Sequence, residues 1–317
     1  MVWKKLGKIF DPTNHTLPNQ CREYAKSPQV LVNDNFVRIY FCTVQNDEND
    51  KSLSHISFVD FDLDFSTIIQ ISNSPVISLG ELGCFDEHGI FPINVVRDEG
   101  RILAYTTGWS RRTAVSVETS VGLAISENNG ESFTKLGSGP VLTSSLHEPF
   151  LVCDSFVAMF NNIFHMWYIY GIEWIESSIE GSPQRVYKIA HATSVDGVIW
   201  AKEGKTIIPD KLNVHESQAL PSVIYHNGLY HMYFCYREAT DFRSNPKRAY
   251  KIGYAYSQDL SSWTREDDKS GLDISETGWD SEMQCYPHIF HCNNKVYLLY
   301  NGNEFGRYGF GLAVLEE

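Results

Sequence analysis

The 317-residue sequence lacks several features that mark common classes of protein. It has no run of about 18 consecutive apolar residues, so we expect no membrane span, and no apolar stretch follows the lysines near its N-terminus, so we expect no signal peptide. Its seven cysteines are an odd number without a C-x-x-C pair, which argues against a disulfide framework and favours a reducing cytoplasm. Acidic residues outnumber basic ones, 39 to 26, and the net charge of −13 disfavours nucleic acid and anionic membranes as partners.

Short catalytic and metal-binding motifs are also missing. The sequence contains no G-x-S-x-G, no P-loop, no G-x-G-x-x-G and no Cys/His cluster with zinc spacing. His288 and His291 are three residues apart, so on a strand they face opposite sides and cannot share a metal ion. We therefore expect neither a metal nor a cofactor.

The sequence does contain a long repeat. Short apolar strands begin near Ser27, Phe91, Ser155, Leu220 and Tyr286, roughly 65 residues apart. Second and third strands follow each of them, separated by turn residues, and most repeats add a fourth segment that begins with an aromatic residue. Short strands at a fixed long period predict an all-β propeller.

The two ends of the chain complement each other. The last repeat stops at Glu317 without a fourth segment, while MVWKKLGKIF at Met1–Phe10 resembles the fourth segments that begin at Phe133 and Trp200. We therefore predict that the N-terminal strand pairs with the last blade and closes a five-bladed propeller, which leaves no free edge in the ring closure. Residues 1–317 are expected to form a single domain.

Three turns between third and fourth strands look alike and contain acidic or amide residues. Asp196 and Asp259 lie in two of these turns, which join the outer strands far from the propeller axis. We expect these residues to stabilise the turns rather than to act in catalysis. The aromatic residues that begin the outer strands are expected to pack between blades; they are Trp3, Phe133, Trp200 and Trp263.

Polar side chains collect where a propeller places its functional face. The loops before the first strands and after the second strands meet around the central channel. The carboxylates there are Glu23, Asp86, Glu87, Glu148, Asp154, Glu173, Glu216, Glu238, Asp280, Glu282 and Glu304. Tryptophan, asparagine and arginine lie among them, a mixture that suits a sugar, and cleavage of a glycosidic bond requires two carboxyl groups, one of them protonated. We expect acids from several blades to converge on one pocket.

Several motifs make the resemblance to a known family more specific. FDEHG at Phe85, GW at Gly108, HEP at His147, GWD at Gly278 and YNGN at Tyr300 resemble a bacterial group of predicted glycosidases. These are similar to the five-bladed arabinanases, xylosidases, invertases, levansucrases and β-mannoside phosphorylases, and the resemblance spans nearly the whole chain. In the hydrolases an Asp at the start of blade one usually serves as base or nucleophile, with an Asp from blade two and a Glu from a later blade as helper and acid. This sequence departs from that pattern, because CREYAKS from Cys21 contains no Asp.

On this basis we predict Asp86, Glu216 and Asp280 as catalytic carboxylates, with Glu216 as the acid. The predicted substrate-binding residues are Trp109, Glu148, Trp174, Arg237, His288, Asn301 and Asn303. Each of them has a structural alternative: the acids could cap turns or shape loops, the arginine could pair with a neighbouring acid, and the tryptophans could pack between blades.

The sequence therefore predicts a cytoplasmic glycoside hydrolase with a carbohydrate substrate. One alternative is a glycoside phosphorylase, whose anion site would draw on the available cations, which are Arg22, Lys26, His88, Arg111 and Arg237. Two further alternatives are a glycan-binding propeller without turnover, which the missing blade-one Asp favours, and a glycosyl transferase.

Overall fold

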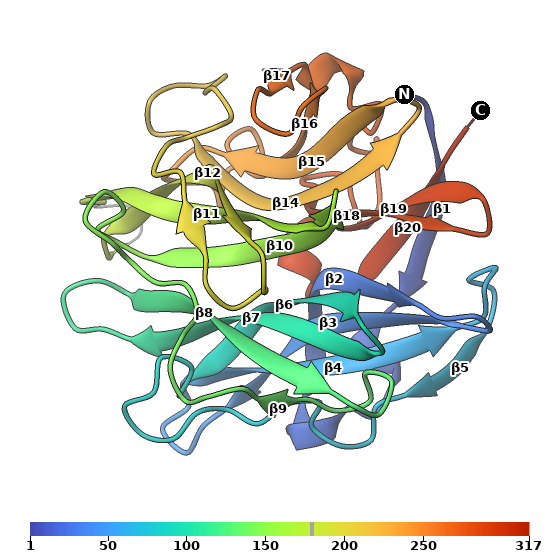
Figure 1. Cartoon of the computed structure of the whole chain (residues 1–317), viewed down its shortest axis with the longest axis horizontal. Coiled ribbons are helices and arrows are strands. Elements are labelled where there is room, and N and C mark those ends of the chain that lie inside the picture. Colours follow the sequence, from blue (N-terminus) through green and yellow to red (C-terminus); the bar gives the residue numbers. More distant parts are fainter. Residues whose placement is uncertain (178–180, 317) are drawn as a thin grey trace.

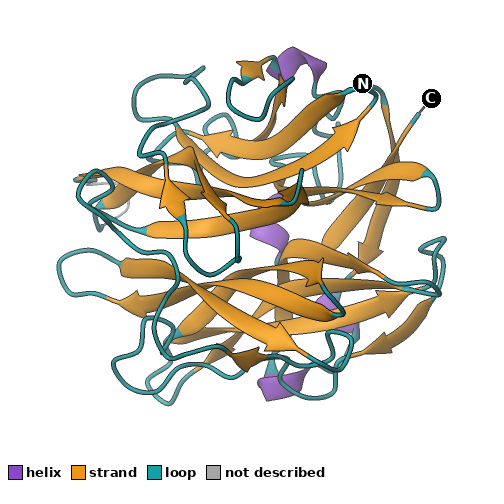
Figure 2. Cartoon of the chain, in the orientation of Figure 1, coloured by secondary structure: helices purple, strands orange, loops and turns teal. Residues whose placement is uncertain are grey.

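Strands dominate the chain and helices are few and short (Figure 2). The computed structural model describes residues 1–177 and 181–316. Among these residues, no helix has the length and apolar character needed to cross a membrane. The short helices lie in connections; they are η1 (Pro12–Asn14), η2 (Pro18–Gln20), η3 (Asp267–Lys269) and α1 (Asn303–Gly306).

The first four sets of strands follow one another along the chain as antiparallel four-stranded units. Unit 1 is β2 (Glu23–Val32), β3 (Val37–Asn46), β4 (Ser52–Phe61) and β5 (Ile68–Ile71). Unit 2 is β6 (Gly89–Asp98), β7 (Arg101–Arg111), β8 (Val117–Ser126) and β9 (Thr134–Lys135). Unit 3 is β10 (Val152–Phe160), β11 (Ile163–Ile175), β12 (Gln184–Ser194) and β13 (Ala201–Lys202). Unit 4 is β14 (Ser217–His226), β15 (Leu229–Arg237), β16 (Lys251–Ser257) and β17 (Thr264–Arg265), and a parallel bridge between Ser54 and Gly89 joins units 1 and 2 into one sheet.

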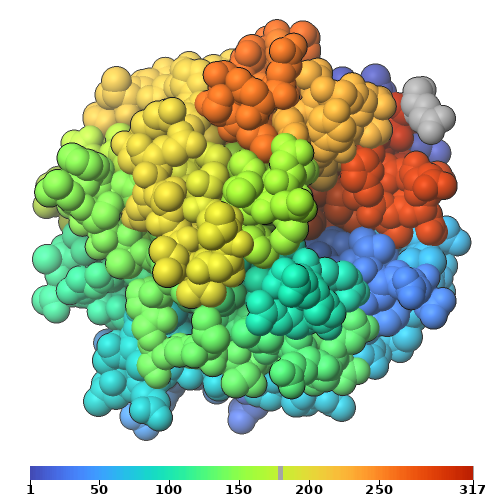
Figure 3. Space-filling view, in the orientation of Figure 1, coloured from blue at the N-terminus to red at the C-terminus, as the bar shows by residue number. Residues whose placement is uncertain are grey.

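Unit 5 is built from both ends of the chain, as predicted. Its strands are β18 (Cys285–Cys292), β19 (Lys295–Asn301), β20 (Phe310–Leu315) and the N-terminal β1 (Trp3–Phe10). Strands β1 and β20 are antiparallel, with Trp3 opposite Leu315 and Lys8 opposite Gly311. The two termini lie close together, and blue N-terminal atoms border red C-terminal atoms on the surface (Figures 1 and 3).

An aromatic contact joins each unit to its neighbour. A residue in or just before the outer strand of one unit packs on an aromatic ring in the second strand of the unit before it, with ring centroids 5.0–6.2 Å apart. The pairs are Phe65 with Tyr297, Phe133 with Tyr40, Trp200 with Tyr105, Trp263 with Trp167, and Trp3 with Tyr233. The predicted packing of the four outer-strand aromatics is confirmed, and Phe65 adds a fifth contact between units 5 and 1. Aromatic side chains bury large areas, so these contacts account for much of the cohesion between units.

Each first strand contains a one-residue bulge at the same place. In unit 3, Cys153 pairs with Ile169 and Phe156 with Trp167, so three steps along β10 oppose two along β11. The same shift occurs in β2, β6, β14 and β18. The bulges begin at Ser27, Phe91, Asp154, Leu220 and Tyr286. Bulges bend a strand and redirect a side chain, and they are common beside active sites.

The acidic turn residues have the structural role expected of them. Asp196 Oδ1 accepts hydrogen bonds from the backbone N–H groups of Val198 and Ile199, both 2.8 Å long. Asp259 accepts two equivalent bonds, and these backbone donors lower its pKa to about 2. Both carboxylates therefore stabilise the turns in which they lie.

Candidate functional site

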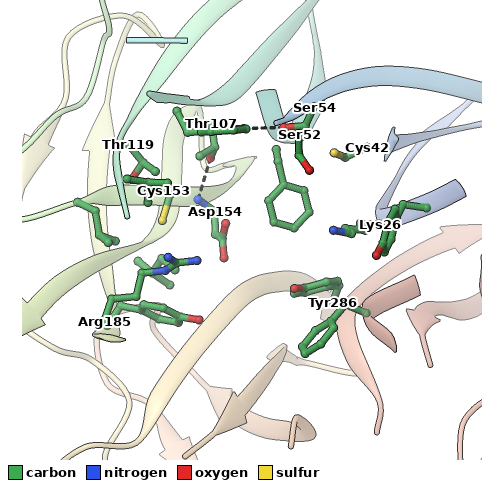
Figure 4. Close-up of a pocket in the computed structure, with 18 of the residues that line it drawn as sticks. Lys26, Cys42, Ser52, Ser54, Thr107, Thr119, Cys153, Asp154, Arg185 and Tyr286 are labelled. Atoms are coloured by element: carbon green, nitrogen blue, oxygen red, sulfur yellow. Dashed lines mark hydrogen bonds between the residues drawn. The ribbon is translucent and has the colours of Figure 1, made fainter. Parts of the chain in front are cut away.

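A cavity of about 370 Å³ opens where the first strands of the units come together (Figure 4). All five units contribute to its lining. Representative residues, one from each unit in chain order, are Lys26, Trp109, Asp154, Arg237 and Tyr286. A lining of aromatic rings with a few charged groups is typical of small-molecule sites.

Asp154 is the one acidic residue among the described residues that line this cavity. It begins the bulge in β10 with a positive φ of 52°, and its backbone N–H donates to Thr107 Oγ1 at 2.8 Å. Its carboxyl group points into the cavity, between Arg185 on one side and Lys26 on the other (Figure 4). Burial raises the pKa of Asp154 to about 7, although the charge of Arg185 opposes the shift. A large fraction of this carboxyl group is therefore protonated at neutral pH, as a general acid requires.

Basic side chains surround Asp154. Lys26, Arg185, Arg237 and Arg243 all line the cavity. The Lys26 ammonium lies 4.0 Å from the centroid of the Tyr24 ring, and burial lowers its pKa. Of the cations considered from the sequence for an anion site, Lys26 and Arg237 thus line the cavity, whereas Arg111 pairs with Asp47 outside its lining, at 3.0 Å.

The structure also brings the predicted Trp109 into the cavity wall. Its indole Nε1 donates to Ser54 Oγ at 2.5 Å, which fixes the ring at the junction of units 1 and 2. The thiols of Cys42 and Cys153 line the same space. Burial raises the pKa of Cys42 to about 12, so this thiol is not a nucleophile at neutral pH.

Four of the acids predicted to converge on one pocket lie outside the lining of this cavity. Asp86, Glu148, Glu216 and Asp280 are buried, but each pairs with a cation from the outer strand of its own unit, and none of them lines the cavity. The pairs are Asp86 with Lys135 at 2.5 Å, Glu148 with Lys202, Glu216 with Arg265 at 2.5 Å, and Asp280 with Lys5 at 2.8 Å. The sequence argument placed these residues at the channel because they precede first strands; the partners that hold them away from it lie far along the chain.

Glu216 accepts four hydrogen bonds, two at each carboxylate oxygen. Its Oε1 accepts hydrogen bonds from Arg265 and from Gln218 Nε2 at 3.0 Å. Its Oε2 accepts from the backbone N–H groups of Lys211 and Leu212, both at 2.9 Å. Asp280 is similar: burial alone would raise its pKa, but hydrogen bonds from Lys5, Ser275 and Gln284 hold it below the ordinary value.

The other predicted substrate-binding residues also lie outside the cavity lining. Asn301 is completely buried; its Oδ1 accepts from Ser27 N–H, and its Nδ2 donates to the carbonyls of Ala25 and Gly309, each at 2.8 Å. These bonds use its hydrogen-bonding groups to tie unit 5 to unit 1.

Asn303, His288 and Trp174 have comparable structural surroundings. Asn303 Oδ1 accepts from Glu282 N–H at 2.8 Å and its Nδ2 donates to the Gly278 carbonyl at 3.0 Å. His288 Nε2 accepts from Val30 N–H at 3.2 Å, and burial lowers its pKa to about 3. Trp174 packs on the hydrophobic core of units 3 and 4.

The sequence distinguishes Asp154 from the residues at the same position of the other repeats. The first two bulge residues are Ser27-Pro28, Phe91-Pro92, Leu220-Pro221 and Tyr286-Pro287 in four units, but Asp154-Ser155 in the third. An acid at a position that the other repeats fill with a residue before proline stands out only when the bulges are aligned. In the described part of the chain, no cluster of three or more His, Cys, Asp or Glu side chains could hold a metal ion.

Comparison with known proteins relates the chain to a family and to a fold. The chain is 32% identical over all 317 residues to the uncharacterized protein Rv1502 of Mycobacterium tuberculosis, and the match covers both proteins completely. The chain belongs to the same family as Rv1502. A search of protein-family models gives no match.

Solved structures with the same fold are carbohydrate enzymes. A glycoside hydrolase superposes with a TM-score of 0.74 at 16% identity, covering 99% of this chain and 91% of that one. The β-1,2-mannobiose phosphorylase from Listeria innocua superposes with a TM-score of 0.69 at 11% identity, covering 99% and 96%. The predicted resemblance to propeller glycosidases is confirmed at the level of the fold.

Proposed function

We propose that this member of the Rv1502 family is a carbohydrate-active enzyme, a single-domain five-bladed propeller closed by β1, with its active site in the central cavity. The aromatic contacts between successive units, including the one between units 5 and 1, support the closed ring of five. Lining residues from every unit support a position for the cavity near the ring axis. The aromatic walls suit the apolar faces of a sugar ring.

The observation that carries the proposed chemistry is Asp154. It is the one carboxyl group of the described cavity lining, and burial raises its pKa to about 7. Hydrolysis through paired carboxylates needs a second group to activate water or to attack the sugar. Because the described lining contains one such group, the attacking group must come with a co-substrate, and phosphate is the co-substrate that a cavity rich in cations suits best.

We therefore infer a glycoside phosphorylase. Neutral Asp154 donates its proton to the glycosidic oxygen as the bond from that oxygen to the anomeric carbon breaks. A phosphate oxygen forms the new bond to the anomeric carbon, which gives a sugar 1-phosphate and a free sugar hydroxyl. Asp154 is left ionised, and the proton that hydrogen phosphate gives up as it becomes the ester restores Asp154 by way of the solvent. Lys26 lies across the cavity from Arg185, so its ammonium is available to hold the phosphate.

The test is a panel of glycosides incubated with and without inorganic phosphate, on the wild type and on Asp154→Asn. We expect turnover that requires phosphate, with formation of sugar 1-phosphate, and a loss of roughly 10²–10⁴-fold in Asp154→Asn, the usual contribution of a general acid. Asp268→Asn is a matched control, because the Asp268 side chain is 98% exposed.

Three other results would change the assignment. Turnover independent of phosphate would replace the phosphorylase by a hydrolase. Full activity in Asp154→Asn would remove Asp154 as the acid. Sugar binding without any product would assign the cavity to recognition alone.

A further inference from the structure

The charge of the cavity is opposite to that of the molecule. The chain carries 39 acidic and 26 basic residues, yet the described cavity lining holds four basic residues and one acidic residue. A cavity that concentrates positive charge in a chain that is negative overall attracts anionic ligands.

The Arg237 side chain is fixed by several contacts within the protein. It ends β15 and is 2% exposed. The guanidinium carbon lies 3.6 Å from the Phe242 ring centroid and 5.2 Å from that of Tyr187. Nη2 donates to Tyr187 Oη at 2.8 Å, and Nη1 donates to the backbone carbonyls of Glu238 and Ala239 at 2.7 and 3.2 Å. The group is therefore held rigidly in place.

Arg237 nevertheless lacks a counter-charge. No carboxylate of the described residues lies within ion-pair distance of its guanidinium, and its buried Nε has no hydrogen-bond partner. The other buried arginines that pair across strands show the contrast: Arg38 bonds both oxygens of Asp60, at 2.8 and 2.7 Å. A buried charge without a counter-charge is costly. Burial opposes the charged form of Arg237, but Tyr187 and Tyr250 outweigh it and raise the pKa of the guanidinium, so the group stays charged and an anion would add the counter-charge that it lacks.

The other charged groups of the cavity do not supply that anion. Lys26 can relieve its own burial by losing a proton, whereas an arginine cannot be deprotonated in a protein. Asp154 interacts with Arg185, and its pKa near 7 leaves much of it neutral. The described groups of the cavity therefore give Arg237 no carboxylate partner, which points to an anion on the ligand.

We propose that the sugar bound in this cavity is acidic and that its own oxyanion, a carboxylate or a phosphate ester, pairs with Arg237. The guanidinium presents planar N–H donors that suit such a group. This inference rests on the proposed carbohydrate function and adds a substrate class to it. The attacking phosphate is a separate anion, held on the Lys26 side of Asp154.

The experiment is calorimetric titration with matched sugars. Glucose, galactose and mannose are each compared with their uronic acids and their 6-phosphates, and inorganic phosphate is titrated alone. At least one acidic sugar is expected to bind roughly ten- to a hundredfold more tightly than its neutral counterpart, as a charge-assisted hydrogen bond implies. The carboxylate and phosphate arms tell the two sources of the oxyanion apart.

Variants connect the preference to Arg237. Arg237→Gln should abolish the advantage of the acidic sugar, whereas Arg237→Lys should retain part of it. Arg112→Gln is a control in an arginine whose side chain is 55% exposed. Circular dichroism and thermal unfolding establish that each variant is folded. Should Arg237→Gln not fold, the inference is tested by Arg237→Lys together with the comparison of acidic and neutral sugars on the wild type.

Two results would overturn the inference. The first is equal binding of acidic and neutral sugars throughout the panel. The second is an acidic preference that survives in folded Arg237→Gln. Tight binding of acidic sugars without phosphate-dependent turnover would leave this inference standing and remove the proposed phosphorylase, so the two failures are distinguishable.

Discussion

At the scale of single residues, the surroundings of a carboxyl group determine what it can do. Glu216 and Asp154 are both buried acids near the start of a first strand. Glu216 accepts hydrogen bonds from Arg265, from Gln218 and from two backbone N–H groups. Asp154 lies buried in the cavity wall, and burial raises its pKa to about 7 against the opposing charge of Arg185. A carboxyl group is thus a structural anchor in one case and, in the proposed reaction, a proton donor in the other.

This difference predicts a pH-dependent stability at Asp154. The folded pKa of about 7 lies above the ordinary value of 3.8, so folding favours the neutral carboxyl group. The stability that the neutral carboxyl group of Asp154 contributes is fully present below pH 4 and is lost as the pH rises through 7. The side chain of Asp154→Asn cannot ionise. Between pH 4 and pH 8 the free energy of unfolding of the variant should therefore rise relative to that of the wild type by roughly 1–4 kcal/mol, since each pKa unit is worth about 1.4 kcal/mol.

The measurement is urea unfolding of both proteins at the two pH values. Asp268→Asn should run parallel to the wild type, because the Asp268 side chain is 98% exposed. A difference between Asp154→Asn and the wild type that stays constant with pH would contradict the raised pKa.

At the scale of elements, the outer segment of each of units 2 to 5 makes two kinds of contact through residues that are two positions apart. Trp3 and Lys5, Phe133 and Lys135, Trp200 and Lys202, and Trp263 and Arg265 share this spacing. Such residues lie on the same side of a strand. The aromatic ring packs on the preceding unit, while the cation reaches the carboxylate before the first strand of its own unit.

Loss of one such cation is expected to be severe. Arg265→Met leaves Glu216 buried without its partner, since their side chains are 4% and 0% exposed. We expect the free energy of unfolding to fall by roughly 3–5 kcal/mol. Chemical denaturation measures the change, and Glu216→Gln combined with Arg265→Met should recover part of it. A fall below about 1 kcal/mol, as for a surface ion pair, would show that the pair is not a structural anchor.

The elements were largely predictable from the sequence, whereas the site was not. The strand repeat, the inter-unit aromatics and the pairing of β1 with the last unit all follow from the period of the sequence. The position of Asp280 depends on Lys5, which is 275 residues away, and local patterns contain no trace of that contact. The direction of Asp154 depends on a bulge, which a count of alternating residues does not reveal. The cations of the cavity come from several units and converge only in three dimensions.

At the scale of the whole molecule, the N-terminal strand joins the two ends of the chain. It pairs with β20, supplies Lys5 to Asp280, and inserts Trp3, whose Nε1 donates to Tyr233 Oη at 3.0 Å and to the Ser270 carbonyl at 2.9 Å. Its loss would leave the edge of β20 unpaired, and exposed strand edges promote aggregation.

Deletion of residues 1–10 is therefore expected to abolish cooperative unfolding of the chain and to produce aggregates. Size-exclusion chromatography and thermal unfolding measure both effects. A synthetic peptide of residues 1–10 added during refolding should restore monodisperse, folded protein. A truncated chain that unfolds cooperatively near the wild-type temperature would show that β1 is dispensable.

The shared bulge also bears on how such a protein could acquire a new activity. Four of the five bulge positions share one backbone conformation, with φ between 47° and 56° at Ser27, Asp154, Leu220 and Tyr286, and two of them, Asp154 and Tyr286, already face the cavity. A side chain introduced at Ser27 or Leu220 would start from the same backbone geometry as Asp154. A change of one residue at one of these positions could therefore add, move or delete a reactive group while the remaining units keep their fold, so the repeated units are a framework for evolutionary and engineered changes of reaction.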